Sequence, residues 1–264
     1  MRLGIIGYGR MGKWFADKLR EKFEIGVFDI DPPKLKETSE TIYSTLEDLI
    51  VNSDIILVAT SLDATHSVLK EIREILLRKK LKNKIIFDIA SIKKKVIPVL
   101  ETFPETVKVC SIHPLFSNRS KDFKSRKIVI IPIKGREKDC DPVKSLFESL
   151  GAEIVVSDPE THDRAIGITI SLPYFIGVAF SYLISQENLN FLNKYAGTSF
   201  EHFLTYSIMI AKEKPEFIIS LLNNEYSYAA IRKFLQLTGK LIKSINEVSE
   251  FESFFKKIAK HLKV

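Results

Sequence analysis

Two short polar segments follow apolar runs that are typical of buried strands, and they carry the side chains best suited to chemistry. They are residues 88–93 (DIASIK) and residues 111–116 (SIHPLF). A histidine at a strand end, here His113, can accept a proton from a substrate hydroxyl, and Ser91 would orient that histidine or the hydroxyl. A second interpretation stays open at this point, in which His113 only caps the turn at Pro114.

A glycine-rich turn lies near the start of the chain, between an apolar run and a segment with helical spacing. It consists of Gly7, Tyr8, Gly9, Arg10, Met11 and Gly12. In this pattern the first glycine permits a tight turn, the second lets the backbone approach a pyrophosphate, and the third allows close packing of helix on strand. The helix N-terminus offers N–H groups and a positive dipole end to the phosphates. The motif therefore predicts a dinucleotide-binding site.

An acidic residue, Asp29, ends the second apolar run of the chain. A carboxylate at this place accepts hydrogen bonds from ribose hydroxyls and repels a 2′-phosphate, which favours NAD over NADP as the cofactor. Two observations weigh against this preference: Asp29 could simply cap the turn that follows it, and Arg10 could reach a phosphate. NADP therefore remains an alternative cofactor.

Two hydroxyl residues, Thr60 and Ser61, follow the next predicted strand. Ligands of open α/β sheets lie outside the carboxyl ends of the strands, so these residues are candidates for cofactor contacts. They could equally cap a helix near Ala64, and the two roles are compatible.

The elements that must position these side chains change character at residue 158. Before it, near-continuous apolar strands alternate with amphipathic helices, which predicts an α/β fold with a mostly parallel, doubly wound sheet of the Rossmann type. After it, only helical periods appear. We expect a nucleotide-binding domain over residues 1–158 and an all-α substrate-binding and dimerisation domain over residues 159–264. Strands are expected at residues 2–6, 24–28, 54–59, 84–89, 107–112, 127–133 and 153–156, and helices at residues 66–78, 94–102, 142–150, 159–186, 188–195, 199–212, 215–222, 226–248 and 250–262.

Composition narrows the class of ligand and of environment. The chain has 264 residues and a net charge of +7, with lysines scattered along it, which favours an anionic small molecule over nucleic acid. Its two cysteines have no metal-ligand spacing, so no metal site is expected. The first residues lead directly into a strand, so we predict a cytoplasmic protein. Residues 165–186 lack charge but contain serine, threonine and proline, which favours a buried helix over a membrane span.

Taken in order, the motifs resemble those of the prephenate and arogenate dehydrogenases of tyrosine biosynthesis. The resemblance rests on GYGRMG at 7–12, DIASIK at 88–93, HPLF at 113–116, GAEIV at 151–155, ETHDRAIG at 160–167, TSFEHF at 198–203 and IAKEKPEF at 210–217. It implies that hydride passes from C4 of a cyclohexadienol to NAD while the ring carboxylate leaves as CO₂. It further implies that His113 accepts the hydrogen bond of the C4 hydroxyl with help from Ser91, and that the helical domain forms a homodimer.

The chain departs from the family pattern at two positions. Met209 stands where the family has an arginine that holds a substrate carboxylate, and Tyr174 stands where the family has a histidine. The methionine thioether cannot replace the two charged hydrogen bonds of a guanidinium group. Either another cation holds the substrate carboxylate, or the substrate differs. Besides Tyr174, Ser91 and His113, the candidates for contact with the substrate are the cations Lys93, Arg119, Lys121 and Lys212.

Two other functions stay open. The chain could act on another small acid, as hydroxyisobutyrate-type dehydrogenases do with a lysine of the helical domain, for which Lys240 is the candidate. It could also be a non-catalytic homologue that only binds NAD.

Dimerisation is predicted separately, because the charge-free helix and the aromatic residues Phe251, Phe254 and Phe255 offer more apolar surface than a small helical domain buries alone.

Overall fold

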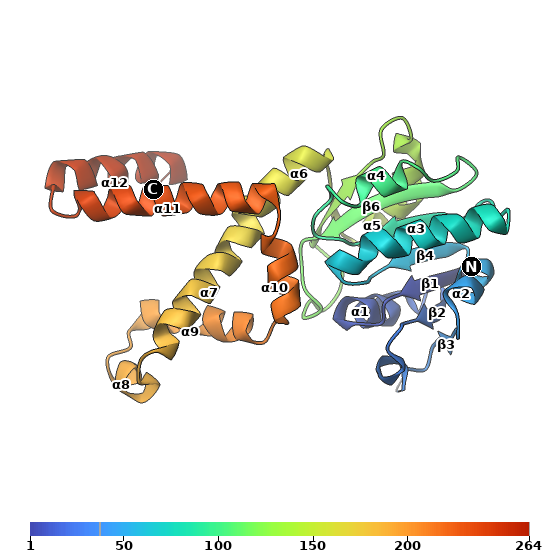
Figure 1. Ribbon diagram of the computed structural model, residues 1–264, viewed down its shortest axis with the longest axis horizontal. Coiled ribbons are helices and arrows are strands. Elements are labelled where there is room, and N and C mark those ends of the chain that lie inside the picture. Colours follow the sequence, from blue (N-terminus) through green and yellow to red (C-terminus); the bar gives the residue numbers. More distant parts are fainter. Residues whose placement is uncertain (37, 264) are drawn as a thin grey trace. The chain divides into compact units, whose positions relative to one another are not determined.

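A computed structural model describes residues 1–36 and 38–263, which form two compact units, Met1–Ala165 and Ile166–Val264. The first unit is built on an eight-stranded sheet (Figure 1) with the order β3-β2-β1-β4-β5-β6-β7-β8. Neighbouring strands are parallel except β6 and β7, which are antiparallel. The strands are β1 (Arg2–Ile6), β2 (Glu24–Phe28), β3 (Thr41–Ile42), β4 (Ile55–Val58), β5 (Ile85–Asp88), β6 (Lys108–Pro114), β7 (Lys127–Ile131) and β8 (Glu153–Val156).

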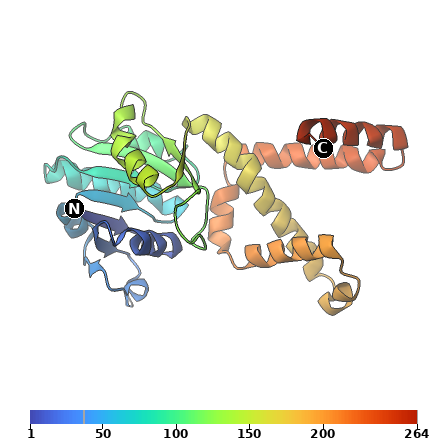
Figure 2. The same ribbon diagram turned by 180° about the vertical axis from the view of Figure 1, so that it is seen from behind.

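Helices cover both faces of this sheet (Figures 1 and 2). Successive strand residues point to opposite faces, so Ile56 joins one apolar core while Leu57 joins the other. One core receives side chains from α1 (Arg10–Leu19) and α5 (Asp141–Ser149), and the other from α2 (Leu46–Asn52), α3 (Leu62–Arg78) and α4 (Ile97–Leu100). The predicted doubly wound α/β fold is therefore confirmed.

Several element bounds differ from the sequence-based expectation. Strand β6 extends through His113 and Pro114 because these residues pair with Val129 and Ile128 of the antiparallel β7. The helix expected over 94–102 is reduced to α4. The short β3 and the helix α2, which begins after the cap that Thr45 provides to the Asp48 amide, were not predicted.

The second unit is helical throughout its described residues, as expected. The chain enters it through α6 (Pro159–Ile166), a π-helical turn (Gly167–Ser171) and α7 (Leu172–Ser185). The helix expected over residues 159–186 thus contains a local change of winding, and the predicted division after residue 158 lies at the start of α6. The remaining helices are α8 (Leu189–Lys194), α9 (Thr198–Ala211), α10 (Pro215–Leu222), α11 (Glu225–Ser244) and α12 (Val248–Leu262).

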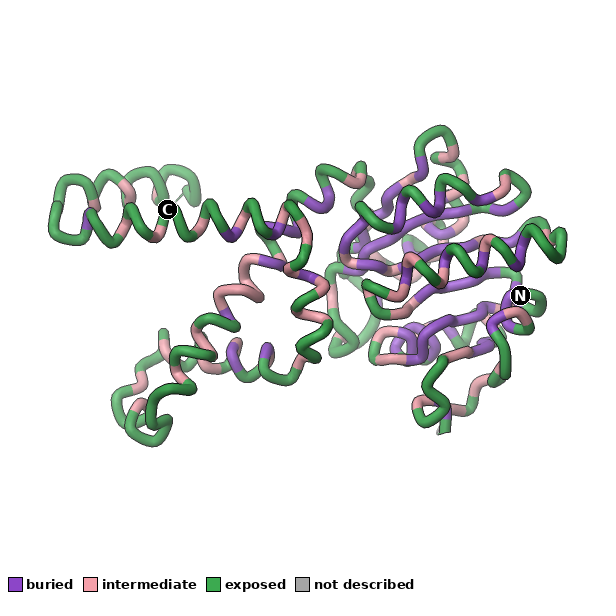
Figure 3. The backbone as a smooth tube through the Cα atoms, in the orientation of Figure 1, coloured by how far each residue is buried: buried purple, intermediate pink, exposed green. Residues whose placement is uncertain are grey.

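The charge-free helix is not buried within one chain, contrary to the expectation for residues 165–186. Helix α7 packs on α9, where Gly177 lies against Tyr206 and Ile210. Its other side is uncovered, and Tyr182 and Leu183 are 71% and 62% exposed. Figure 3 shows the same contrast between the mostly buried strands of the first unit and the exposed helices of the second. The helical segment Pro159–Ser185 is long and apolar enough to cross a membrane, by length and composition alone. In its most apolar stretch of 18 residues, only 22% of the residues are buried.

Candidate functional site

The glycine turn has the geometry that its sequence predicts. Gly7 adopts a φ of +93°, which favours glycine, and a Cβ on Gly12 would lie 2.0 Å from the carbonyl oxygen of Gly7. A Cβ on Gly9 would meet no atom within 4 Å, so this residue borders open space. Gly9 is the N-cap of α1, and no side chain of the described residues caps the helix there. The amide groups of this turn and the space beside Gly9 fit the phosphates of a dinucleotide.

Asp29 ties the glycine turn to the end of β2. Its Oδ2 accepts a hydrogen bond of 2.7 Å from the Tyr8 amide, and its Oδ1 accepts bonds from the Asp31 amide and from Lys34 Nζ at 2.9 and 3.0 Å. Burial alone would raise the pKa of Asp29, but these three donors together outweigh burial and lower it. Asp29 is therefore favoured as a carboxylate, and in this form it both caps the following turn and holds the glycine turn in place.

Thr60 and Ser61 begin the connection from β4 to α3. Thr60 Oγ1 lies 3.0 Å from Thr65 Oγ1, and the Thr65 hydroxyl donates to the Ser61 carbonyl. Ser61 occupies the N-cap position of α3, but its side chain makes no capping bond. The helix thus begins at Leu62, slightly before the expected start near Ala64, and the exposed Ser61 hydroxyl does not cap it.

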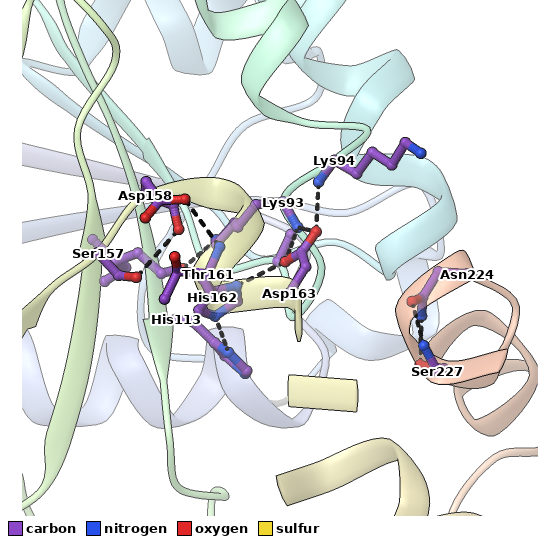
Figure 4. A network of polar contacts seen from close by, with 12 residues as sticks. Lys93, Lys94, His113, Ser157, Asp158, Thr161, His162, Asp163, Asn224 and Ser227 are labelled. Atoms are coloured by element: carbon purple, nitrogen blue, oxygen red, sulfur yellow. Dashed lines mark hydrogen bonds and ion pairs between the residues drawn. The ribbon is translucent and has the colours of Figure 1, made fainter. Parts of the chain in front are cut away.

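A chain of three buried side chains connects β6 to α6 (Figure 4). His113 Nδ1 lies 3.0 Å from His162 Nε2, and His162 Nδ1 lies 2.7 Å from Asp163 Oδ1. Asp163 also accepts hydrogen bonds from the backbone amides of Lys93 and Lys94, at 2.9–3.0 Å. The capping bond of α6 is instead donated by the Thr161 amide to the Asp158 carboxylate. His113 is thus held from one side by an imidazole rather than by the turn at Pro114.

Lys93 is a structural cation rather than a ligand for substrate. Its side chain is completely buried, and Nζ donates to the Ile112 carbonyl at 2.7 Å and lies 3.3 Å from Asp88 Oδ1. Burial lowers the pKa of Lys93, while the nearby carboxylates of Asp88 and Asp163 oppose that shift. The expectation that Lys93 binds a substrate carboxylate is therefore wrong, because its ammonium is enclosed and already bonded.

The environment of His113 favours its neutral form. Burial lowers the pKa of His113 well below its ordinary value, and the positive charge of Lys93 and the neighbouring His162 lower it further. The ring is 5% exposed, and Nε2 has no hydrogen-bond partner among the described residues. A neutral imidazole with one unpartnered nitrogen is the arrangement that a general base needs.

The other predicted residues are not part of this network. Ser91 is half-buried in the turn after β5, Arg119 lies exposed beyond β6, and Lys212 is exposed after α9. Tyr174 packs its ring edge-on against Phe217 within the helical unit, with 5.9 Å between centroids. Lys240 is exposed on α11 and lines a cleft between α11 and α12 of about 340 Å³. No group of three metal-ligating side chains occurs within residues 1–36 and 38–263.

Sequence reasoning missed the partners of His113. Neither His162 nor Asp163 is among the candidates that the sequence indicates. The available signal was the adjacent His-Asp pair directly after the last strand of the sheet, where a first helical turn can reach back to the strand ends. His162 lies 49 residues after His113 in the sequence, so only the folding of the chain brings the two rings together.

Two family models cover almost the whole chain. Residues 15–156 match the nucleotide-binding domain of prephenate dehydrogenase, and residues 158–260 match the dimerization domain of prephenate dehydrogenase. The chain belongs to the prephenate dehydrogenase family. The predicted family and its N-terminal nucleotide-binding domain are thereby confirmed.

Individual relatives agree with this assignment. A probable arogenate/prephenate dehydrogenase of Methanocaldococcus jannaschii is 25% identical over 97% of this chain, which spans 60% of the length of that relative. The fold resembles prephenate dehydrogenase from A. aeolicus in complex with hydroxyphenyl propionate and NAD⁺, with a TM-score of 0.81, 23% identity, and coverage of 100% and 98% of the two chains. It also resembles Synechocystis arogenate dehydrogenase, with a TM-score of 0.74, 17% identity, and coverage of 100% and 99%.

Proposed function

We propose that this protein catalyses the NAD-dependent oxidative decarboxylation of prephenate or arogenate, with His113 as the base for the substrate hydroxyl. The observation that carries the proposal is the state of His113: a buried neutral imidazole with Nδ1 bonded to His162 and with Nε2 unpartnered among the described residues. Family membership supplies the class of reaction, and the two relatives named as arogenate and prephenate dehydrogenases supply the two candidate substrates.

The sheet supports a common site for cofactor and base. Strands β1, β4, β5 and β6 are consecutive and parallel, so their carboxyl ends lie along one edge. The glycine turn follows β1 and His113 lies near the end of β6. Three strand spacings separate them, about 14 Å at about 4.8 Å each. A dinucleotide whose pyrophosphate lies on the glycine turn would therefore extend its nicotinamide toward His113 and Ser91.

The chain's own residues would hold NAD at three places. The amides of the glycine turn would bind the phosphates and Asp29 the ribose hydroxyls, while Thr60 and Ser61 lie where the chain leaves β4. When bound, NAD supplies the acceptor for the hydride that leaves C4 of the substrate. Asp29 favours NAD over NADP, because its carboxylate would repel a 2′-phosphate.

In the reaction, His113 would move one proton and the protein would position the ring. Nε2 of His113 takes the proton of the C4 hydroxyl as the hydride departs, and the C4–O bond gains double-bond character. The bond from the ring to its carboxylate then breaks, CO₂ leaves, and the electron pair enters the ring, which becomes aromatic. The proton returns from Nε2 to the phenolic oxygen. Aromatisation drives the reaction, so the main contribution of the protein is placement and polarisation.

The substrate is an anion, and its carboxylates require cations that Met209 cannot supply. With Lys93 enclosed, the exposed cations Arg119, Lys121 and Lys212 remain the candidates, and Ser91 and Tyr174 remain candidates for hydroxyl contacts. We also propose that the protein acts in the cytoplasm as a homodimer formed through the helical unit. The match to a dimerization domain and the uncovered face of α7 support the dimer.

Turnover is the direct test. Purified protein incubated with NAD and either prephenate or arogenate should form NADH and a phenolic product, and His113→Asn should lower kcat by about 10²- to 10⁴-fold. Absence of turnover with both substrates, in protein that binds NAD, would refute the proposal. If Lys240→Ala abolished activity while His113→Asn did not, the hydroxyisobutyrate-type mechanism would be correct instead.

A further inference from the structure

We propose that His162 and Asp163 are positioning residues that fix the tautomer of His113, so that the proton lies on Nδ1 and the lone pair on Nε2. This inference deepens the proposed function and rests on it for the role of His113 as a base. The tautomer itself is a property of the protein without substrate, so it can be measured independently of activity.

The argument begins at Asp163. One of its oxygens accepts hydrogen bonds from the Lys93 amide and from His162 Nδ1, and the other accepts bonds from the Lys93 and Lys94 amides. Backbone amides can only donate, so both oxygens act as acceptors, which is the pattern of a carboxylate. His162 Nδ1 must therefore carry a hydrogen and donate it to Asp163.

The protonation state of His162 decides what its other nitrogen can do. His162 is 3% exposed and its ring lies beside the buried His113, in a cluster that already contains the enclosed ammonium of Lys93. A neutral His162 has a single ring proton, and its bond to Asp163 places that proton on Nδ1. In this state Nε2 carries a lone pair and accepts, and we assign the direction of the next bond for the pair of neutral rings.

His113 must then donate to His162. The 3.0 Å separation between His113 Nδ1 and His162 Nε2 requires one donor and one acceptor. Since His162 accepts, the hydrogen lies on His113 Nδ1, and a neutral His113 has its lone pair on Nε2. The opposite tautomer would present an N–H to the substrate hydroxyl and could not take its proton.

The chain of bonds from His113 through His162 to Asp163 also stabilises the protonated His113 that forms during the reaction. When Nε2 takes the proton of the substrate hydroxyl, His113 becomes an imidazolium that continues to donate from Nδ1 to His162, which donates in turn to the Asp163 carboxylate. The charge is thus formed next to a prepared acceptor in a buried site, where such bonds are strongest. The direction of each bond follows from the amides of Lys93 and Lys94, which hold Asp163 in place.

The test is ¹⁵N NMR of histidine-labelled protein without substrate, in which five histidines give resolvable ring signals. At a pH where both His113 and His162 are neutral, the wild-type spectrum should show a protonated Nδ1 and an unprotonated Nε2 for His113. His162→Leu should move the proton to Nε2, whereas His162→Gln, whose amide oxygen can accept the same bond, should retain it. His261→Gln, on the exposed end of α12, serves as the control and should leave the His113 signals unchanged.

Kinetics then separate positioning from simple structural support. With a substrate that is turned over, His162→Leu should lower kcat by about 10- to 100-fold, the range for partners that orient an active group, with KM little changed and partial rescue in His162→Gln. A wild-type His113 with its proton on Nε2 overturns the inference, and that result needs no variant that folds. Failure of turnover in wild-type protein with the predicted tautomer present would instead overturn the proposed function alone.

Discussion

At the scale of single residues, the protonation of His113 couples the proposed chemistry to stability. Burial and the neighbouring Lys93 lower the pKa of His113 well below that of a free histidine. In the unfolded chain His113 therefore binds its proton near the ordinary value of about pH 6.5. In the folded chain it binds that proton only at a lower pH. The neutral His113 therefore costs no folding stability above about pH 6.5, and the protein loses stability as the pH falls below that value.

The expected result is a pH-dependent difference between wild type and His113→Gln. Below about pH 6.5 the free energy of unfolding of the wild type should fall by up to about 1.4 kcal/mol per pH unit from this group, until the folded protein also binds the proton. The variant should lack this contribution, as urea unfolding across a pH series would show, with the exposed His261→Gln as control. Parallel curves for wild type and His113→Gln would contradict the buried neutral histidine.

Asp29 is the residue at which cofactor choice can be tested. Its carboxylate binds the Tyr8 amide and neutralises Lys34, so Asp29→Ser should loosen the glycine turn and leave a cation beside the ribose site. We expect NAD affinity to fall about 10- to 100-fold, as for the loss of charged hydrogen bonds, and the preference to shift toward NADP. Titration with both cofactors measures this ratio, with Asp31→Ser in the same loop as control. An unchanged ratio would assign Asp29 to turn capping alone.

At the scale of elements, the junction of β1 and α1 depends on two glycines for different reasons. Gly12→Ala would place a methyl group 2.0 Å from the Gly7 carbonyl, so α1 must move, at a cost of about 1–3 kcal/mol. Gly9→Ala would place the methyl group in open space and keep an extended backbone that alanine adopts freely. We expect Gly12→Ala to lower the melting temperature, and Gly9→Ala to keep it but weaken NAD binding. NAD affinity equal to wild type in Gly9→Ala would contradict a phosphate site beside this glycine.

The connection between β5 and β6 depends on the buried pair of Lys93 and Asp88. Lys93→Met would leave the Asp88 carboxylate enclosed without a cation, at a cost of about 3–5 kcal/mol in the free energy of unfolding. Adding Asp88→Asn should recover much of this loss, because the asparagine oxygen can still accept from the Ala90 amide. Urea unfolding measures both variants, with the exposed Lys95→Met as control. A double variant as unstable as the single one would show that packing, rather than charge, dominates here.

At the scale of the whole molecule, the second unit contains more apolar surface than its helices cover. Tyr182 and Leu183 on α7 are mostly exposed, and so are many apolar side chains of α11 and α12. Many exposed apolar side chains of this kind are typical of a unit that forms an interface between subunits. The match of residues 158–260 to a dimerization domain points to a second copy of this chain as the partner.

We therefore expect a dimer in light scattering at micromolar concentration. Leu183→Glu should shift the equilibrium toward monomer, because a carboxylate would be buried without a partner in the interface. The matched control is Leu77→Glu, which places the same charge on an exposed leucine of α3 in the first unit. A monomeric wild-type protein, or a dimer that Leu183→Glu leaves intact, would exclude this face as the interface.

The sequence by itself determined the features that depend on local pattern. Periodicity in apolar residues fixed the alternation of strands and helices, since each element must bury one face or both. The glycine turn and Asp29 were also predictable, because the steric demands of a tight turn act between residues that are close in the chain. His113 was identified as a chemical residue from its position at a strand end.

Only the tertiary structure decided what surrounds that histidine and which cations are enclosed. No local pattern says which partner His162 or Lys93 has, yet His162 is bonded to His113 and Lys93 is buried against Asp88. Their positions depend on how α6 folds back over the ends of β5 and β6, and such long-range packing leaves no periodic trace in the sequence. The sequence predicted surplus apolar surface on the charge-free helix but not which of its residues stay exposed, because an apolar helix has the same sequence pattern whether its own chain or a partner covers it.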